Sequence, residues 1–136
     1  MSQPTQVTIV CSICSREKDK RKGTLPARER YLGSHIKIAE AAAKKEGLLF
    51  FILSGKHGLL SDREVVEYYD YQLKEGDVMR LSLRLHGQLI RSPLHIEEIR
   101  FYTKTKPAWQ PYRDALQQAA QKAKIKLQVI ELPDDA

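Results

Sequence analysis

The sequence predicts an α/β fold, a three-layer sandwich in which helices cover both faces of a mostly parallel sheet of about four strands. Two observations predict this fold class. Short apolar runs rich in β-branched or aromatic residues alternate with longer segments of helical periodicity, which gives the order strand–helix–strand–helix–strand–helix–strand. In addition, the run over 48–53 is apolar throughout, as expected of a parallel strand that is buried on both faces.

The first half of the chain predicts two strands and two helices. Residues 7–10 are β-branched and apolar, which favours a buried first strand. The charged stretch that follows is expected to form an exposed, mobile loop, and a short helix over 27–31 begins after a proline suited to its first turn. Ser34 can cap the second helix, and Gly47 stands where glycine favours a helix end. The apolar strand over 48–53 comes next.

The second half predicts an extended segment, two more helices and two more strands. Residues 65–71 are β-branched and aromatic, and we expect them to form an extended crossing segment and not a regular strand of a sheet. Asp77 can cap a helix whose leucines follow helical spacing. A third strand over 99–102 follows, then a last helix that opens at Pro107, then a fourth strand over 127–132.

All 136 residues are predicted to form one α/β domain, with loose tails over 1–6 and 133–136. No internal repeat or low-complexity linker divides the chain. No run of about 18 apolar residues is present, so we expect neither a membrane span nor a membrane partner. The amino terminus lacks the basic and apolar segments of a secretory signal, and the cytoplasm is therefore the expected location. The sequence leaves the oligomeric state open.

The net charge of +6 is concentrated in the stretch over 16–22 and in the second half of the chain. Such an excess of lysine and arginine predicts either solvated faces or attraction to a phosphate-rich partner, such as a nucleotide or a nucleic acid. The charge alone does not choose between these two interpretations.

The two cysteines, Cys11 and Cys14, form a C-x-x-C pair. A structural zinc site normally takes four ligands, and the histidines are scattered, so we expect no metal and no cofactor. A thioredoxin-like pair is disfavoured because the other elements of that motif are missing, and Cys14 is expected to be a free thiol. Phosphate-binding loops, dinucleotide fingerprints and the Gly-x-Ser-x-Gly esterase motif are also missing.

Polar side chains gather where the first two predicted strands end. Because the carboxyl ends of parallel strands share one edge of a sheet, the residues after the first strand and those over 54–58 are expected to meet there. The amino end of the helix that begins at Ser34 points to the same edge, where its N–H groups favour an anion. The residues expected to converge are Cys11, Ser12, Tyr31, Ser34, Ser54, Lys56 and His57.

Three of these residues are candidate catalytic groups. Cys11 can act as a nucleophile if the helix end and a neighbouring Lys56 or His57 lower its pKa; the alternative is a small apolar residue at a strand end. His57 can serve as a general acid or base, or it can bond to loop backbone instead. Lys56 can bind a phosphate or be a solvated lysine, and the adjacent Gly55 favours a tight loop that a ligand can approach closely.

The candidates for ligand binding are Ser12, Tyr31, Ser34, Ser54, Gly55, Tyr69 and Asp70. The Tyr69-Asp70 pair can orient a base edge or a sugar, although Asp70 can equally cap a turn. Trp109 and Tyr112 can stack on a base, but core packing is the stronger expectation for both.

Several short motifs together resemble a known family. They are, in order, Cys11-Ser12, a basic loop, Pro26-Ala27 with Tyr31 and Ser34, Ile52-Leu53-Ser54-Gly55-Lys56-His57-Gly58-Leu59, and Tyr69-Asp70. This order resembles a small, largely uncharacterised bacterial and phage family, in which a strand is followed by Leu-Ser-Ala-Lys-His/Tyr-Gly-Leu and then by Tyr-Asp. It is also distantly similar to YaaA-type peroxide-stress proteins and to the uracil-DNA-glycosylase-like domain of archaeosine synthases. The resemblance covers residues 7–73 and implies an α/β fold with a site near Cys11, Ser54, Lys56 and His57.

Two classes of function follow from these observations. The converging polar edge and the resemblance favour an enzyme or ligand-binding domain that acts on a nucleotide, a modified nucleobase or an N-glycosidic bond. The alternative is a non-catalytic nucleic-acid-binding module that uses the basic surface. The sequence does not decide whether the protein is catalytic at all.

Overall fold

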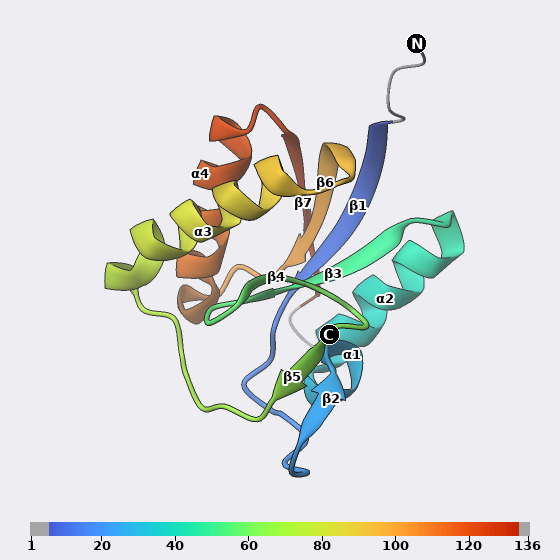
Figure 1. Ribbon diagram of the computed structural model, residues 1–136, viewed down its shortest axis with the longest axis vertical. Helices are drawn as coiled ribbons and strands as arrows, with labels where there is room; N and C mark the ends of the chain where they lie inside the picture. The colour runs from blue at the N-terminus through green and yellow to red at the C-terminus, as the bar shows by residue number, and fades with distance from the viewer. Residues whose placement is uncertain (1–5, 134–136) are drawn as a thin grey trace.

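A five-stranded sheet forms the middle layer of the computed structural model, which describes residues 6–133 (Figure 1). Its strand order is β4-β3-β1-β6-β7, with β4 antiparallel to β3 and all other neighbours parallel. The strands are β1 Gln6–Ile13, β3 Leu49–Ser54, β4 Gly58–Ser61, β6 His95–Thr103 and β7 Lys126–Glu131. The predicted fold class is confirmed. The edge strand β4 was not predicted from the sequence, and Gln6, expected in a tail, opens β1. Residues 1–5 and 134–136 lie outside the described part.

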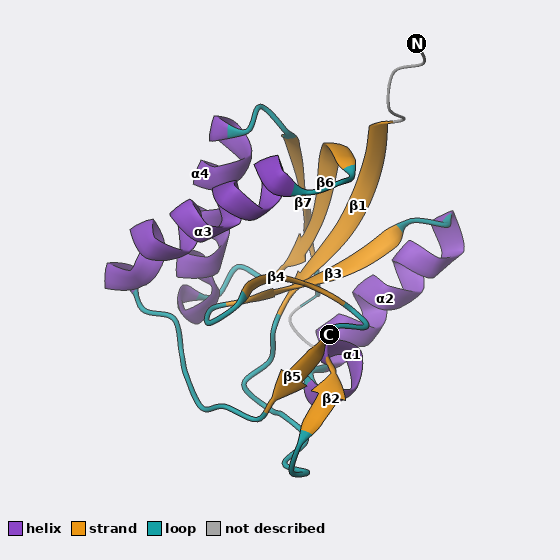
Figure 2. Cartoon of the chain, in the orientation of Figure 1, coloured by secondary structure: helices purple, strands orange, loops and turns teal. Residues whose placement is uncertain are grey.

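Helices cover both faces of the sheet (Figures 1 and 2). Helix α2 lies on one face, and α3 and α4 pack together on the other. The helices are α1 Ala27–Arg30, α2 Ser34–Glu46, α3 Val78–Arg91 and α4 Gln110–Lys122, and the 3₁₀ turns η1 Glu75–Asp77 and η2 Pro107–Trp109 lead into α3 and α4. Within the described residues, no helix is long and apolar enough to cross a membrane.

Strand β1 separates the two apolar cores. Ile9, Cys11 and Ile13 belong to the core beneath α3 and α4, whereas Val10 belongs to the core beneath α2. This alternation follows from the strand geometry, in which successive side chains point to opposite faces of the sheet. The apolar faces predicted for α3 and α4 are confirmed, because the leucines of α3 and the alanines of α4 fill the first core.

A second, two-stranded sheet lies beside the main one (Figure 2). Strand β2, Thr24–Pro26, pairs antiparallel with β5, Val65–Glu67. We expected residues 65–71 to form an extended crossing segment and not a regular strand. Three of them, Val65–Glu67, do form a regular strand, because Thr24–Pro26 at the end of the charged loop pairs with them. This small sheet carries α1 against the core beneath α2.

Two helix ends differ in detail from the sequence prediction. Gly33, not Ser34, is the cap residue of α2, and Ser34 is an exposed first-turn residue without a capping hydrogen bond. Gly47 ends α2 as predicted, with a φ of 69° that glycine adopts without strain. The Asp77 carboxylate accepts a hydrogen bond from the Lys74 amide at 3.2 Å, and so stabilises η1 just before α3 begins.

The charged loop after β1 is held in place by Arg30, whose side chain is fully buried. Its guanidinium donates to the carbonyl oxygen of Val66 in β5 at 3.0 Å. It also donates to loop carbonyls at 2.6 to 2.9 Å, those of Asp19, Arg21 and Gly23. The expectation of an exposed loop is therefore right for Arg16, Glu17 and residues 20–23, and wrong for Ser15, which is buried.

We expect Arg30→Ala to lower the free energy of unfolding by about 3 kcal/mol or more, because four carbonyls lose a charged donor inside the protein. Urea unfolding followed by circular dichroism measures the change. The matched control is Arg28→Ala in the same helix, where the side chain is exposed and a change within about 0.5 kcal/mol is expected. Equal losses for the two variants would contradict this role of Arg30.

Candidate functional site

The candidate site is a pocket at the carboxyl edge of the sheet, which we call the switch-point pocket. Helix α2 connects β1 to β3 across one face, whereas α4 connects β6 to β7 across the other, so the winding reverses between β1 and β6. Open α/β sheets bind ligands at such a reversal, outside the carboxyl ends of the strands. The pocket measures about 230 Å³, and its lining includes Cys14, Arg16, Lys18, Asp70, Tyr71 and Trp109.

Cys14 is the first residue after β1, and its partly buried side chain lines this pocket. Burial raises the pKa of the thiol above its ordinary value. The opposing, pKa-lowering influences come from the Gly55 amide, the charge of Lys18, and the hydroxyls of Tyr112 and Tyr69. The thiol is therefore neutral in the free protein, but groups that stabilise a thiolate already surround it.

Three buried hydroxyl groups form a hydrogen-bonded chain behind the pocket. The Tyr69 hydroxyl lies 2.6 Å from that of Tyr31 and 2.9 Å from that of Ser54. Ser54 Oγ also accepts hydrogen bonds from the amides of Lys56 at 3.2 Å and His57 at 3.0 Å, which closes the turn after β3. Burial raises the pKa of Tyr31 to about 12 and raises that of Tyr69 further, so both phenols stay neutral at neutral pH.

Cationic and aromatic groups surround the Tyr69 ring. The Nζ atoms of Lys18 and Lys56 lie 4.7 Å and 5.2 Å from its centroid, and the His57 ring meets it edge-on at 5.3 Å. Burial and the positive charges of Lys56 and Arg84 lower the pKa of His57. Within the described residues, neither lysine forms a salt bridge. This edge of the sheet therefore carries positive charge that no protein carboxylate pairs with directly.

The structure brings most of the predicted site residues together. Tyr31, Ser54 and Tyr69 share the hydroxyl chain, and the Gly55 amide faces Cys14. Asp70 is exposed and lines the switch-point pocket. Lys56 and His57 line a second pocket of about 370 Å³ together with Arg84. Lys18 from the first pocket and Lys56 from the second both approach the Tyr69 ring.

Three predicted residues lie apart from this cluster: Cys11, Ser12 and Ser34. Cys11 is fully buried beneath α3 and α4, and burial raises the pKa of its thiol instead of lowering it as predicted. Ser12 is fully buried, and its hydroxyl has no hydrogen-bond partner among the described residues. Ser34 is exposed on the first turn of α2. Cys11 was placed at a strand end because β1 was predicted three residues too short.

Some residues of the site were not identified from the sequence. Strand β1 continues to Ile13, where its pairing with β3 ends, so Cys14 and Lys18 are the residues that follow it. The shorter predicted strand did not bring these two residues to the site. Arg80 donates to the Gly55 carbonyl at 3.1 Å and Arg84 to the His57 carbonyl at 2.8 Å, so α3 holds the turn after β3. Their spacing of four residues places both arginines on one face of the helix, and this pattern could have identified them as a pair from the sequence.

Trp109, the last residue of η2, lines the pocket. It therefore does more than pack in the core, which was the stronger expectation from the sequence. Its ring contacts that of His35 with centroids 4.6 Å apart, and the His35 Nε2 lies 2.7 Å from the Ile13 carbonyl oxygen. The indole is therefore held against the amino end of α2 and the end of β1. Tyr112 is buried, packs in the core and directs its hydroxyl to the Leu73 amide, so its packing role is confirmed.

These features define an α/β protein with a pocket at the switch point of a mostly parallel sheet. The chain belongs to the family described as Family of unknown function (DUF6884), whose model matches residues 9–132. No curated protein matches the chain. Among solved structures, a de novo designed Rossmann fold protein is similar, with 13% sequence identity and a TM-score of 0.42, over 95% of this chain and 89% of that chain. A likeness of this size supports no conclusion about function. The described residues contain no group of three or more histidine, cysteine or acidic side chains placed to hold a metal ion.

We expect Tyr69→Phe to lower the free energy of unfolding by about 1–3 kcal/mol, because the hydroxyls of Tyr31 and Ser54 lose their shared partner in a buried setting. Chemical denaturation measures the loss. Tyr68→Phe is the matched control, since this neighbouring side chain is exposed, and it should change stability by less than about 0.5 kcal/mol. Indistinguishable effects would mean that the hydroxyl chain does not stabilise the fold.

Iodoacetamide should alkylate Cys14 in the native protein and leave Cys11 unmodified, because only Cys14 reaches a pocket. Peptide mass spectrometry identifies the modified residue, and the rate should rise about tenfold per pH unit between pH 7 and 9 because the thiolate is the reacting form. Cys11→Ser should retain this rate and Cys14→Ser should remove it. Native labelling at Cys11 would contradict the assignment.

Proposed function

We propose that this protein is an enzyme that acts on a nucleotide or a modified nucleobase bound in the switch-point pocket. The observation that carries the proposal is the composition of that pocket: aromatic rings, unpaired cations and a thiol meet at the place where open α/β sheets bind ligands. The distant similarity of the sequence motifs to the uracil-DNA-glycosylase-like domain of archaeosine synthases favours the same class of substrate.

The base and the phosphate of a nucleotide each have matching groups in the pocket. The rings of Trp109 and Tyr71 offer faces on which a base stacks, and the exposed Asp70 carboxylate accepts hydrogen bonds from base N–H groups. Arg16 and Lys18 supply positive charge for a phosphate. At about 230 Å³, the pocket is smaller than most ligand sites, which start at about 300 Å³, and so suits one base and not a longer segment.

Cys14 is the group that would react with the substrate. Its thiolate would attack an electrophilic carbon bonded to a leaving group, and the sulfur–carbon bond would form as the bond to the leaving group breaks. The proton of the thiol leaves with the displaced group, and water then releases the product and restores the thiol. The Gly55 amide and the charge of Lys18 favour the thiolate needed for the first step.

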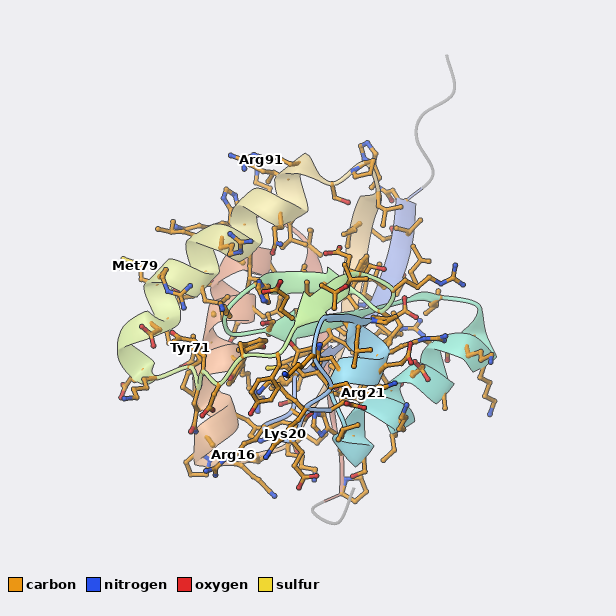
Figure 3. All side chains as sticks on the ribbon, turned by 60° about the horizontal axis from the view of Figure 1, so that its bottom comes forward. Arg16, Lys20, Arg21, Tyr71, Met79 and Arg91 are labelled. Carbon is orange, nitrogen blue, oxygen red and sulfur yellow. The ribbon has the colours of Figure 1, made fainter. Side chains whose placement is uncertain are left out.

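The alternative function is a nucleic-acid-binding module, and one observation favours it. Arg16, Lys20 and Arg21 are exposed on the loop after β1, in the region that Figure 3 brings forward. Arg30 fixes the backbone of this loop, so the cations are presented on an ordered surface. Arg16 also lines the pocket, and Arg21 forms a salt bridge with Asp19 at 3.0 Å. A nucleic acid bound to this surface would contact it through phosphates, with an affinity that falls steeply with salt.

Calorimetric titration with nucleoside monophosphates of each common base separates the two functions. Trp109→Leu should weaken binding of the preferred nucleotide about 5- to 150-fold through lost stacking, and Lys18→Gln should weaken it through lost phosphate contact. The control is Lys22→Gln, which removes an exposed cation of the same loop outside the pocket lining and should leave the affinity unchanged. Thermal melting of each variant verifies its fold.

One outcome would contradict nucleotide binding in the pocket, and another would contradict the role of Cys14. If no mononucleotide binds, and if oligonucleotides bind with an affinity that Lys18→Gln and Lys22→Gln reduce equally, the protein is a nucleic-acid-binding module. If Cys14→Ser binds the nucleotide with unchanged affinity and still turns it over, the pocket is correct but the reacting group is another residue.

A further inference from the structure

The outer face of α3 carries an exposed apolar stripe, formed by Met79, Leu83 and Ile90. These side chains are 72%, 55% and 60% exposed. Their spacing of four and seven residues places them on one side of the helix, away from the leucines that pack into the core. Single exposed apolar residues are normal on protein surfaces, but three that share one helix face form an apolar row, in which Gly87 separates Leu83 from Ile90. Figure 3 shows Met79 and Arg91 near the two ends of this helix.

Arginine side chains flank the apolar stripe. Arg80, Arg84 and Arg91 lie along one side of it, and the helix from Val78 to Arg91 contains no acidic residue. Arg80 and Arg84 turn toward the carbonyl oxygens of Gly55 and His57, not toward carboxylates. Within the described residues, none of these three arginines forms a salt bridge, so the flank of the stripe keeps its positive charge.

The charge pattern decides which occupant fits this face. Two copies of α3 that pack antiparallel about a twofold axis would bring the same flank of each helix together, and six arginines would then line one seam. Like charges at close range oppose such a dimer. An amphipathic helix with acidic residues beside its apolar face complements both the apolar stripe and the arginines. Its apolar residues would cover the stripe, and its carboxylates would pair with the arginines.

We infer that α3 is a docking surface for an acidic amphipathic helix of a partner protein. The surface is separate from the switch-point pocket, and the inference does not depend on the proposed enzymatic function. It adjoins the candidate site through Arg80 and Arg84, which reach the turn after β3. A partner carboxylate that engages these guanidinium groups competes with the carbonyl oxygens they now contact.

The test uses the full chain and a synthetic helical peptide of about 18 residues, with leucines on one face and glutamates beside them. Fluorescence anisotropy should show binding of this peptide at low salt and at least tenfold weaker binding of the same peptide with lysine in place of glutamate. Leu83→Gln and Arg84→Gln should each weaken binding of the acidic peptide at least fivefold. Leu32→Gln, which changes an apolar residue of similar exposure elsewhere, should not affect it.

Two measurements could overturn the inference. Equal binding of the acidic and basic peptides, or acidic-peptide binding that Leu83→Gln leaves unchanged, would show that the stripe and its charge do not recognise the helix. Sedimentation equilibrium is the second measurement. A dimer of the unmodified protein that Leu83→Gln dissociates would assign the face to a second copy of the chain.

Discussion

The parallel pairing of β1 with β3 on one side and with β6 on the other brings Cys14, the turn after β3 and Trp109 to one edge of the sheet. The β1–β3 ladder continues to the pair Ile13 and Leu53, so both strands end at the same level. The Cys14 amide then donates to the Leu53 carbonyl at 2.9 Å, which joins the two strand exits. Because β6 lies on the other side, η2 and Trp109 arrive at the same edge, and a pocket forms between segments far apart in the sequence.

The hydroxyl chain is the second constraint, because a buried hydroxyl is costly unless it has a partner. Tyr31, Ser54 and Tyr69 come from three separate segments, yet each depends on another for its hydrogen bond. The chain therefore fixes the turn after β3 relative to α1 and to the segment after β5. Rigid support of this kind allows the exposed side chains around it, such as Lys56 and Asp70, to be held near one edge.

Sequence patterns predicted the elements that depend on residues close in the chain. Features that depend on contacts between distant segments were not predicted. The apolar run over 48–53 predicted β3, because a mostly buried strand is rich in apolar residues. Gly47 predicted the end of α2, because glycine adopts a positive φ without strain. The length of β1 depends on its pairing with neighbouring strands, so β propensity did not predict its last three residues. For this reason Cys11 was predicted to follow the strand, whereas Cys14 does. The burial of Arg30 was equally hidden, since its partners are loop carbonyls and not an acidic side chain.

The raised thiol pKa of Cys14 has a consequence for how the protein withstands oxidants. Peroxide attacks the thiolate, and the first product is a sulfenic acid that can proceed to irreversible forms. A cysteine that stays protonated while its pocket is empty reacts slowly with peroxide, although its side chain reaches the surface. The burial that holds the resting site neutral thus also preserves its sulfur in the reduced state.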